Sequence, residues 1–258
     1  MHKQYTISEA ARIIKDIKEE KDELFQTFKK DERKGIQKLI SKWYSQREQE
    51  TALREEFDRM SSFENELKHQ GFRFIAGIDE VGRGPLAGPV VAAAVILPQD
   101  FCLLGINDSK KLSEKQRESF YELITDKAVA WGTGIISAEE IDRLNIYQAS
   151  KKAMITAVNG LGVYPDHLLI DAMELGTPFP EISLIKGDAR SISIAAASIV
   201  AKVTRDRLME EYAQGYPGYG FQKNMGYGTK EHLEGLKQYG PCPIHRSSFA
   251  PVKELMLK

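Results

Sequence analysis

The sequence predicts an α/β fold preceded by an all-helical segment. From residue 72 onward, short apolar runs alternate with segments in which apolar residues recur every three or four positions. That alternation of strands and helices is typical of α/β domains. Residues 1–70, by contrast, contain a single glycine, no proline and apolar residues at helical spacing. We therefore expect a helical N-terminal extension over residues 1–70 and a main domain over residues 71–258.

The composition limits the compartment and the partners. The formal net charge of the 258 residues is −1, so nucleic acid could be bound only through a local basic patch. The two cysteines, Cys102 and Cys242, form no metal-spaced pair, which argues against a zinc site or a disulfide framework and suits a reducing compartment. Neither a signal peptide nor a run of roughly 20 apolar residues is apparent. We expect a cytoplasmic monomer with no membrane association.

The N-terminal extension carries a clear helix start. Thr6-Ile7-Ser8-Glu9 fits a capping box, in which the Thr6 side chain accepts from the Glu9 amide. Apolar residues at helical spacing follow it, and a break at residues 31–35 separates them from a second such line. We expect two or three helices in a small bundle or arm. Balanced charge fits an exposed helical surface, and an additional nucleic-acid or partner contact stays open as the alternative.

The main domain divides into short elements. Ser113 is a good N-cap with Gln116 at the reciprocal position, so a helix should follow it. The small residues between Ala195 and Ala201 would let a long helix pack closely on the sheet. We expect strands at residues 72–79, 89–97, 128–137, 166–171 and 182–185, helices at 113–127, 138–144, 148–158, 191–212, 230–238 and 251–257, and a loop at 216–227.

The stretch from Gly77 to Pro89 is the centre of this domain. Asp79 and Glu80 follow an apolar run, and neighbouring side chains on a strand point to opposite faces. The two acids can therefore converge on one metal only if the strand ends there. Glycines on either side of Arg83 would let backbone groups approach a ligand, because no Cβ intervenes.

Four acids are the candidate catalytic residues and metal ligands: Asp79, Glu80, Asp171 and Asp188. Most of them end a short apolar run, which places carboxylates at strand ends, where ligand sites of open α/β sheets lie. Clustered carboxylates need cations, and their hard oxygen atoms suit Mg²⁺ or Mn²⁺. Two such ions about 4 Å apart could activate a water and stabilise a leaving oxygen. The alternative is that each acid only caps a turn.

The segment Asp79–Gly84, Asp-Glu-Val-Gly-Arg-Gly, resembles the signature of bacterial ribonuclease HII, a type 2 ribonuclease H. The similarity covers roughly residues 72–250, in the order of that family. Ribonuclease HIII is similar but typically has lysine in the glycine turn and glutamate as the last acid, so Arg83 and Asp188 favour HII. Further matching segments are Asn107–Leu112, Asp171, Lys186–Asp188, Ala195–Lys202 and Gly226–His232.

The resemblance implies a fold and an activity. The fold would be a ribonuclease H-like mixed five-stranded sheet whose early strands are antiparallel. The enzyme would be an endoribonuclease that hydrolyses the RNA strand of RNA/DNA hybrids. It would also incise 5′ of single ribonucleotides in duplex DNA, as in ribonucleotide excision repair. Two-metal-ion hydrolysis, with Mn²⁺ or Mg²⁺ held by the four acids, would leave a 3′-hydroxyl and a 5′-phosphate.

The resemblance also assigns substrate contacts. Main-chain groups of Gly82, Arg83 and Gly84 would contact the ribose 2′-hydroxyl, the group that separates RNA from DNA. Tyr227 would pack on the next sugar, although by itself it could be a core residue between turn glycines. Further candidates for phosphate contacts, each of which could instead be an ordinary surface residue, are Lys110, Lys111, Lys186, Ser198 and Lys202. We expect His232 and His245 to be structural or peripheral.

The sequence argues against three other functions. Gly82-x-Gly84-x-x-Ala87 formally fits a dinucleotide-binding fingerprint, but Pro89 and a β-branched run follow where that motif needs a helix. A non-catalytic nucleic-acid-binding protein is not favoured, because all four acids are present. Another metal nuclease of this fold would lack the glycine turn combined with Tyr227. Residues 251–258 show no clear sliding-clamp peptide with paired aromatics, so a clamp partner is an open alternative without support.

Overall fold

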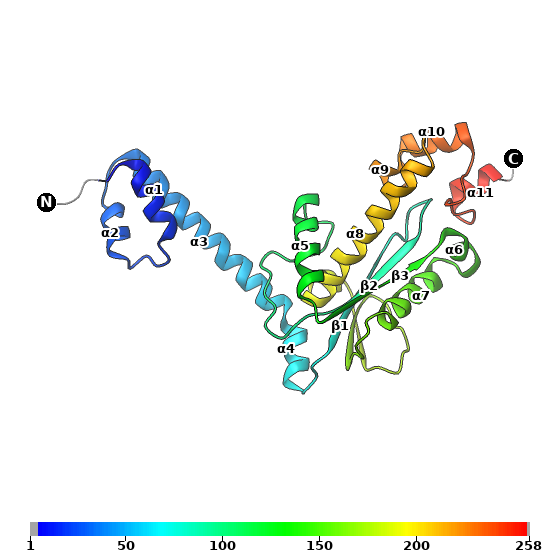
Figure 1. Ribbon diagram of the computed structural model, residues 1–258, viewed down its shortest axis with the longest axis horizontal. Helices are drawn as coiled ribbons and strands as arrows, with labels where there is room; N and C mark the ends of the chain where they lie inside the picture. The colour runs from blue at the N-terminus through cyan, green and yellow to red at the C-terminus, as the bar shows by residue number, and fades with distance from the viewer. Residues whose placement is uncertain (1–4, 257–258) are drawn as a thin grey trace. The chain divides into compact units, whose positions relative to one another are not determined.

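The computed structural model describes residues 5–256 (Figure 1). The chain forms two compact units, one up to Glu56 and one from Phe57 onward. The sequence, in contrast, predicts a boundary after residue 70. We describe each unit by itself.

In residues 5–56, all regular secondary structure is helical. The first unit contains α1 (Ile7–Asp16), α2 (Glu23–Lys29) and most of α3 (Lys34–Met60). The capping box predicted for Thr6 and Glu9 is confirmed: the Glu9 amide donates to the Thr6 hydroxyl, and the Thr6 amide donates to the Glu9 carboxylate. The helices pack through one apolar cluster, consisting of Ala10, Ile14, Ile17, Phe25, Phe28, Ile36, Ile40 and Trp43.

The second unit is built on a mixed sheet. Within residues 5–256 the structure has five strands in the order β3-β2-β1-β4-β5. Strand β2 pairs antiparallel with β1 and β3, whereas β4 pairs parallel with β1 and β5. The predicted mixed sheet with antiparallel early strands is confirmed. The strands are β1 (Ile75–Val81), β2 (Val90–Ile96), β3 (Ala130–Ile136), β4 (His167–Asp171) and β5 (Glu181–Leu184).

Helices cover both faces of this sheet (Figure 1). On one face, α7 (Ile146–Asn159) packs on alternate strand residues, with α6 (Ala138–Leu144) beside it. On the other face, α8 (Ile192–Gly215) and α5 (Glu114–Lys127) pack on the intervening residues. The Ser113 cap of α5 is confirmed. A Cβ on Gly77 would lie 2.0 Å from the Ser193 carbonyl carbon, so only glycine lets α8 come this close to β1.

The segment before β1 is part of this second core. Phe57 and Met60, at the end of α3, belong to the apolar cluster under α8, and Leu67 of α4 (Ser62–His69) packs with Ile75 of β1. Within residues 5–70 the chain thus forms four helices, where the sequence predicts two or three. A turn at Ser61 separates the last two.

The C-terminal part differs in one element from the prediction. The loop expected at residues 216–227 contains a short helix, α9 (Phe221–Asn224). It is followed by α10 (Lys230–Tyr239) and α11 (Ala250–Met256), while Leu257, predicted as the last helical residue, lies outside the described part of the chain. Among residues 5–256, no helix combines the length and the apolar character that a membrane span needs.

Candidate active site

Asp79 and Glu80 lie where one pairing of β1 ends. The strand does not stop at the acids as the sequence predicts, since β1 pairs with β2 as far as Val81. Its pairing with β4, however, ends at Ile78. Glu80 lies within reach of the Arg83 guanidinium, with 3.3 Å between Glu80 Oε1 and Arg83 Nη1. The edge of β1 that faces β4 is therefore free of backbone pairing at the position of both acids.

Asp171 and Asp188 are brought together by a tight turn. Asp171 ends β4, and Asp188 lies in the 3₁₀ turn η1 (Gly187–Ala189) just after β5. The Gly187 amide donates to Asp171 Oδ1 at 2.6 Å. A Cβ on Gly187 would lie 2.6 Å from Ile194 Cδ1 and 3.2 Å from Asp171 Oδ1, so the absence of a side chain permits this approach.

The four acids act on one another electrostatically. Burial, followed by the charges of Glu80 and Asp171 and more weakly of Asp188, raises the pKa of Asp79 well above its ordinary value. Burial is also the main cause that raises the pKa of Glu80 to about 7, against the opposing Arg83 charge. Burial is also the largest cause that raises the pKa values of Asp171 and Asp188. Such mutual shifts are typical of a functional cluster of carboxylates.

Two further groups belong to this cluster. Burial works to lower the pKa of Lys110, but the carboxylates of Asp108, Asp79, Asp188 and Asp171 outweigh it, so the pKa is raised. Lys110 is therefore the predicted phosphate contact that the structure places beside the acids. Asp108 was not predicted. After burial, its charge is the largest cause that raises the pKa of Asp188. Its place two residues before Lys110 in a matching segment was the signal available in the sequence.

The donor set fits divalent metal ions. Asp79, Glu80, Asp171 and Asp188 offer hard carboxylate oxygens, the ligands that Mg²⁺ and Mn²⁺ prefer. Glu80 Oε2 is buried and has no hydrogen-bond partner in the structure, which is costly unless a cation or proton satisfies it. In residues 5–256, no three His, Cys, Asp or Glu side chains already form a metal-binding group.

The glycine turn lies against Tyr227. Gly84 is exposed, and a Cβ built on it would meet only the Tyr227 ring, 3.7 Å from Cε1. Gly82 is buried with φ +94°, and its Cβ would lie 2.3 Å from Arg205 Nε. The two glycines therefore have different roles. Gly82 allows Arg205 to pack closely against the backbone, and Gly84 leaves open surface beside the half-exposed ring of Tyr227.

The other predicted phosphate contacts are placed unevenly. Ser198 is buried, and its hydroxyl donates to the Ala195 carbonyl while accepting from the Ser109 amide, so it joins α8 to the loop before Lys110. Lys202 is held by Asp206 at 2.6 Å. Lys111 is exposed and donates to Asn107. Lys186 is exposed in a left-handed conformation two residues before Asp188.

Two histidines support the backbone of Tyr227. The Cys242 amide donates to His245 Nδ1 at 2.9 Å, so the neutral His245 ring carries its proton on Nε2. His245 Nε2 then donates to His232 Nε2 at 3.0 Å. His232 Nδ1 then donates to the Tyr227 carbonyl at 2.9 Å. Burial lowers the pKa of both rings, to about 4 for His245, so the neutral forms that this chain of bonds requires are favoured.

Two buried arginines, also missed from the sequence, surround the glycine turn. Arg205 of α8 donates to the carbonyls of Ala87, Pro89 and Met225. Arg246 donates to the carbonyls of Gly82, Arg83 and Gly88. Burial, followed by the charge of Arg205, lowers the pKa of Arg246 to about 9. Carbonyl oxygens from segments far apart in sequence compensate these buried charges, and sequence patterns give no sign of that.

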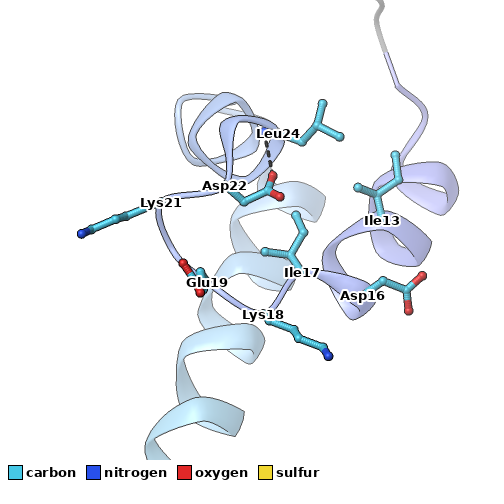
Figure 2. A pocket seen from close by; sticks show the side chains of 8 residues that line it. All are labelled: Ile13, Asp16, Ile17, Lys18, Glu19, Lys21, Asp22 and Leu24. Carbon is cyan, nitrogen blue, oxygen red and sulfur yellow. Dashed lines mark hydrogen bonds between the residues drawn. The ribbon is translucent and has the colours of Figure 1, made fainter.

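A hollow of about 660 Å³ lies within the first unit (Figure 2). It is formed by the end of α1, the start of α2 and the segment between them, with Asp22 turned back to cap α2. Its lining mixes acidic, basic and apolar side chains and includes none of the four candidate acids: Ile13, Asp16, Ile17, Lys18, Glu19, Lys21, Asp22 and Leu24.

Several solved structures resemble this chain in fold. The chain resembles the ribonuclease H2 structure from Pyrococcus horikoshii OT3 at 28% identity and a TM-score of 0.60, covering 70% of this chain and 96% of that one. It resembles the ribonuclease HII in a PCNA:RNase HII complex from Archaeoglobus fulgidus at 27% identity and 0.59, covering 68% and 95%. A Bst-RNase HIII structure, at 19% identity and 0.54, covers 72% and 70% and shares the fold.

Closer relatives are ribonucleases HII. The proteins of that name from Bacillus cereus (strain G9842) and Bacillus mycoides (strain KBAB4) are 58% and 59% identical over 253 residues, 98% of both chains in each case. The family model "Ribonuclease HII" matches residues 76–252, and "Ribonuclease HII N-terminal domain" matches residues 6–68. The chain therefore belongs to the ribonuclease HII family and is a nuclease that hydrolyses phosphodiester bonds.

Proposed function

We propose that this endoribonuclease of RNA/DNA hybrids also incises duplex DNA on the 5′ side of a single embedded ribonucleotide, leaving a 3′-hydroxyl and a 5′-phosphate. The observation that carries the proposal is the combination of two neighbouring features. Asp79 and Glu80, which interact electrostatically with Asp171 and Asp188, lie on β1, and the open glycine turn beside Tyr227 follows directly after that strand. The first suits phosphodiester hydrolysis, and the second suits recognition of a sugar.

Asp79, Glu80, Asp171 and Asp188 would hold the metal ions, Mg²⁺ or Mn²⁺, with two ions during catalysis. When bound, such ions supply an activated water and charge stabilisation for the leaving oxygen. The buried Glu80 Oε2, which has no partner in the structure, supports a ligand role for that side chain. Arg83 pairs with Glu80 Oε1 and thereby orients the carboxylate from the side of the glycine turn.

Basic side chains would hold the nucleic-acid backbone. Lys110 lies in the field of the acids, so its ammonium can contact a phosphate close to the scissile bond. Lys111, Lys186 and Lys202 would contact phosphates farther along the strand. Ser198 is buried, so we assign it the task of positioning the loop that carries Lys110.

Sugar recognition would come from two sides. Backbone groups at Gly82, Arg83 and Gly84 would bond the 2′-hydroxyl, and deoxyribose would leave those bonds unmade. Such a site rejects the analogue strongly because its own polar groups stay unpaired. Tyr227, 46% exposed, would pack on the next sugar toward the 3′ side.

A cleavage assay tests the proposed function. Three duplexes of one sequence are compared with Mg²⁺: all DNA, DNA with one ribonucleotide, and a continuous RNA/DNA hybrid. The proposal predicts one cut, 5′ of the ribonucleotide, in the second duplex and several cuts in the hybrid. The proposal would be refuted if the duplex with one ribonucleotide stays intact or is cut on the 3′ side of the ribonucleotide. We further propose a cytoplasmic monomer that needs no clamp partner for this reaction, so the purified chain alone should suffice.

A further inference from the structure

Arg246 binds the glycine turn from inside the protein. Its side chain is fully buried. Nη2 donates to the Gly82 carbonyl at 2.5 Å, and Nη1 donates to the Arg83 carbonyl at 2.8 Å. Nε and Nη2 also donate to the Gly88 carbonyl, at 3.1 and 2.9 Å. One planar guanidinium thus fixes both ends of a turn whose residues Arg83 and Gly84 are exposed.

This bonding fixes the direction of two amides. In a trans peptide the carbonyl and the N–H point in opposite directions, and both peptides here are trans. The Gly82 carbonyl shares its peptide with the Arg83 amide, and the Arg83 carbonyl shares its peptide with the Gly84 amide. Because Arg246 draws both carbonyls inward, both amides face away from it. Among residues 5–256, no acceptor is bonded to either amide.

We propose that Arg246 is a positioning residue for substrate specificity, which turns the backbone amides of Arg83 and Gly84 toward the ribose 2′-hydroxyl. The inference rests on the proposed function, since it explains how the turn that would read the sugar keeps its geometry. Neither amide can rotate inward without breaking a hydrogen bond to a buried charge, so the donors are preorganised before substrate arrives.

The C-terminal segment holds Arg246 in register with the turn. The Arg246 amide donates to the Leu86 carbonyl, and the Gly88 amide donates to the Ile244 carbonyl, both at 2.8 Å. On the other side, Asp142 of α6 accepts from the amides and hydroxyls of Ser247 and Ser248. The guanidinium therefore enters the turn from a backbone that is anchored on both sides.

The test is the binding preference of the Arg246→Lys chain. Lysine keeps the charge but, as a compact ammonium, lacks the planar fork that spans the Gly82 and Arg83 carbonyls. Full-length proteins are titrated, in chelator without divalent cations, with two labelled duplexes that differ only in one ribonucleotide. The wild type should bind the ribonucleotide duplex at least about tenfold more tightly, the worth of about one hydrogen bond. For Arg246→Lys the ratio should approach one.

A matched control separates positioning from general destabilisation. Val252 is fully buried in the cluster that lies under this segment, so Val252→Ala weakens the same region without touching the turn. It should lower the melting temperature yet keep the wild-type binding ratio. An Arg246→Lys chain that loses stability but keeps the wild-type ratio would overturn the inference.

A measurement on the wild type covers the case in which Arg246→Lys does not fold. The ¹⁵N-labelled amides of Arg83 and Gly84 should shift on addition of the ribonucleotide duplex and shift less with the all-DNA duplex. Equal shifts with both duplexes would mean that these amides do not contact the 2′-hydroxyl, and so would contradict the role of Arg246 in turning them toward it. A wild type that binds both duplexes equally overturns the proposed function together with this inference, whereas a variant that still discriminates overturns the inference alone.

Discussion

Gly84 and Tyr227 lie side by side, since a Cβ at Gly84 would come 3.7 Å from Tyr227 Cε1, an ordinary van der Waals distance. In the sequence these residues are separated by more than half of the second unit. Their proximity places a residue without a side chain next to an aromatic ring, at the surface and directly after the strand that carries Asp79 and Glu80. This is the arrangement that a sugar-reading site would need.

The first prediction is that Gly84→Ala impairs recognition but not folding. An alanine methyl fits beside Tyr227, so the free energy of unfolding should change by less than about 0.5 kcal/mol. The methyl would nevertheless stand where the sugar approaches, so kcat/KM on a single embedded ribonucleotide should fall at least about tenfold. Gly82→Ala is the contrast: its positive φ and the nearby Arg205 predict a loss of about 1–3 kcal/mol in stability. Equal melting temperatures for the two variants would contradict this division.

The second prediction concerns junction reading by Tyr227. If its ring packs on the deoxyribose that follows the ribonucleotide, Tyr227→Ala should slow cleavage of the single-ribonucleotide duplex more than cleavage of a continuous hybrid. The quantity to measure is the ratio of the two rates at one salt and metal concentration. Tyr239→Ala, which removes another exposed tyrosine, is the control and should leave the ratio unchanged. Equal slowing of both substrates by Tyr227→Ala would make Tyr227 a general positioning residue.

The third prediction concerns where the catalytic unit begins. The Glu64 carboxylate is buried and accepts from the Ser191 hydroxyl at 2.5 Å and from the Ser193 amide at 2.9 Å, so it caps α8 just after Asp188. A chain of residues 57–258 should therefore fold, whereas residues 71–258 should lose several kcal/mol, because burial of Met60 and Leu67 alone contributes about 1.5–3 kcal/mol each.

Chemical denaturation of the two truncations measures this difference. Glu64→Ala in the full chain isolates the cap, because it removes the acceptor of both bonds: it should be less stable than the wild type, and Glu66→Ala, at an exposed neighbour, should match the wild type. Equal stability of the two truncations would show that the boundary after residue 70, predicted from the sequence, is the better one.

The fourth prediction concerns pH and metal. The pKa of Glu80 is about 7 in the folded chain against an ordinary 4.5, so between these values the folded state binds more protons than the unfolded state. Stability from this group is thus complete below pH 4.5 and is lost as pH rises through 7. Since Mg²⁺ would replace those protons, it should raise the melting temperature more at pH 8 than at pH 5.5.

The difference between wild type and Glu80→Gln isolates this effect. His232 and His245 titrate in the opposite sense, since their lowered pKa values make stability fall as pH drops below 6.5. Glu80→Gln leaves the histidines in place but removes the Glu80 titration. The variant should show a smaller dependence of the Mg²⁺ effect on pH, and an identical dependence would rule out Glu80 as its source.

Much of this structure was predictable because its signals are local. The Ser113 cap and the apolar run before Asp79 each depend on a few neighbouring residues, and the strand and helix that they predict are present. Arg205 and Arg246 were not predictable in this way. A charged side chain is usually exposed, and only contacts across the fold, such as the Gly82 and Arg83 carbonyls around Arg246, show that it is buried.

The acids were found as candidates without their geometry. The apolar runs before Asp79 and Asp171 indicate strand ends, yet β1 continues to Val81 because β2 pairs with it beyond the point at which β4 stops. Which of the two neighbouring strands stops pairing with β1 first depends on the whole sheet and cannot be predicted from the sequence of β1 alone. The family resemblance implied a mixed sheet with antiparallel early strands, but the order of the strands, and with it the edge on which the acids meet, comes from the structure.

Turnover by Asp79→Asn tests the central claim most directly. The substitution keeps the size of the side chain but removes the charge that burial and the neighbouring acids already oppose, so the chain should fold and bind the single-ribonucleotide duplex at least as well as the wild type. Asp126→Asn, at an exposed acid paired with Lys127, is the control and should cleave normally. The account predicts that Asp79→Asn shows no cleavage in Mg²⁺ while binding is retained. Near-normal turnover by Asp79→Asn in Mg²⁺ would contradict it.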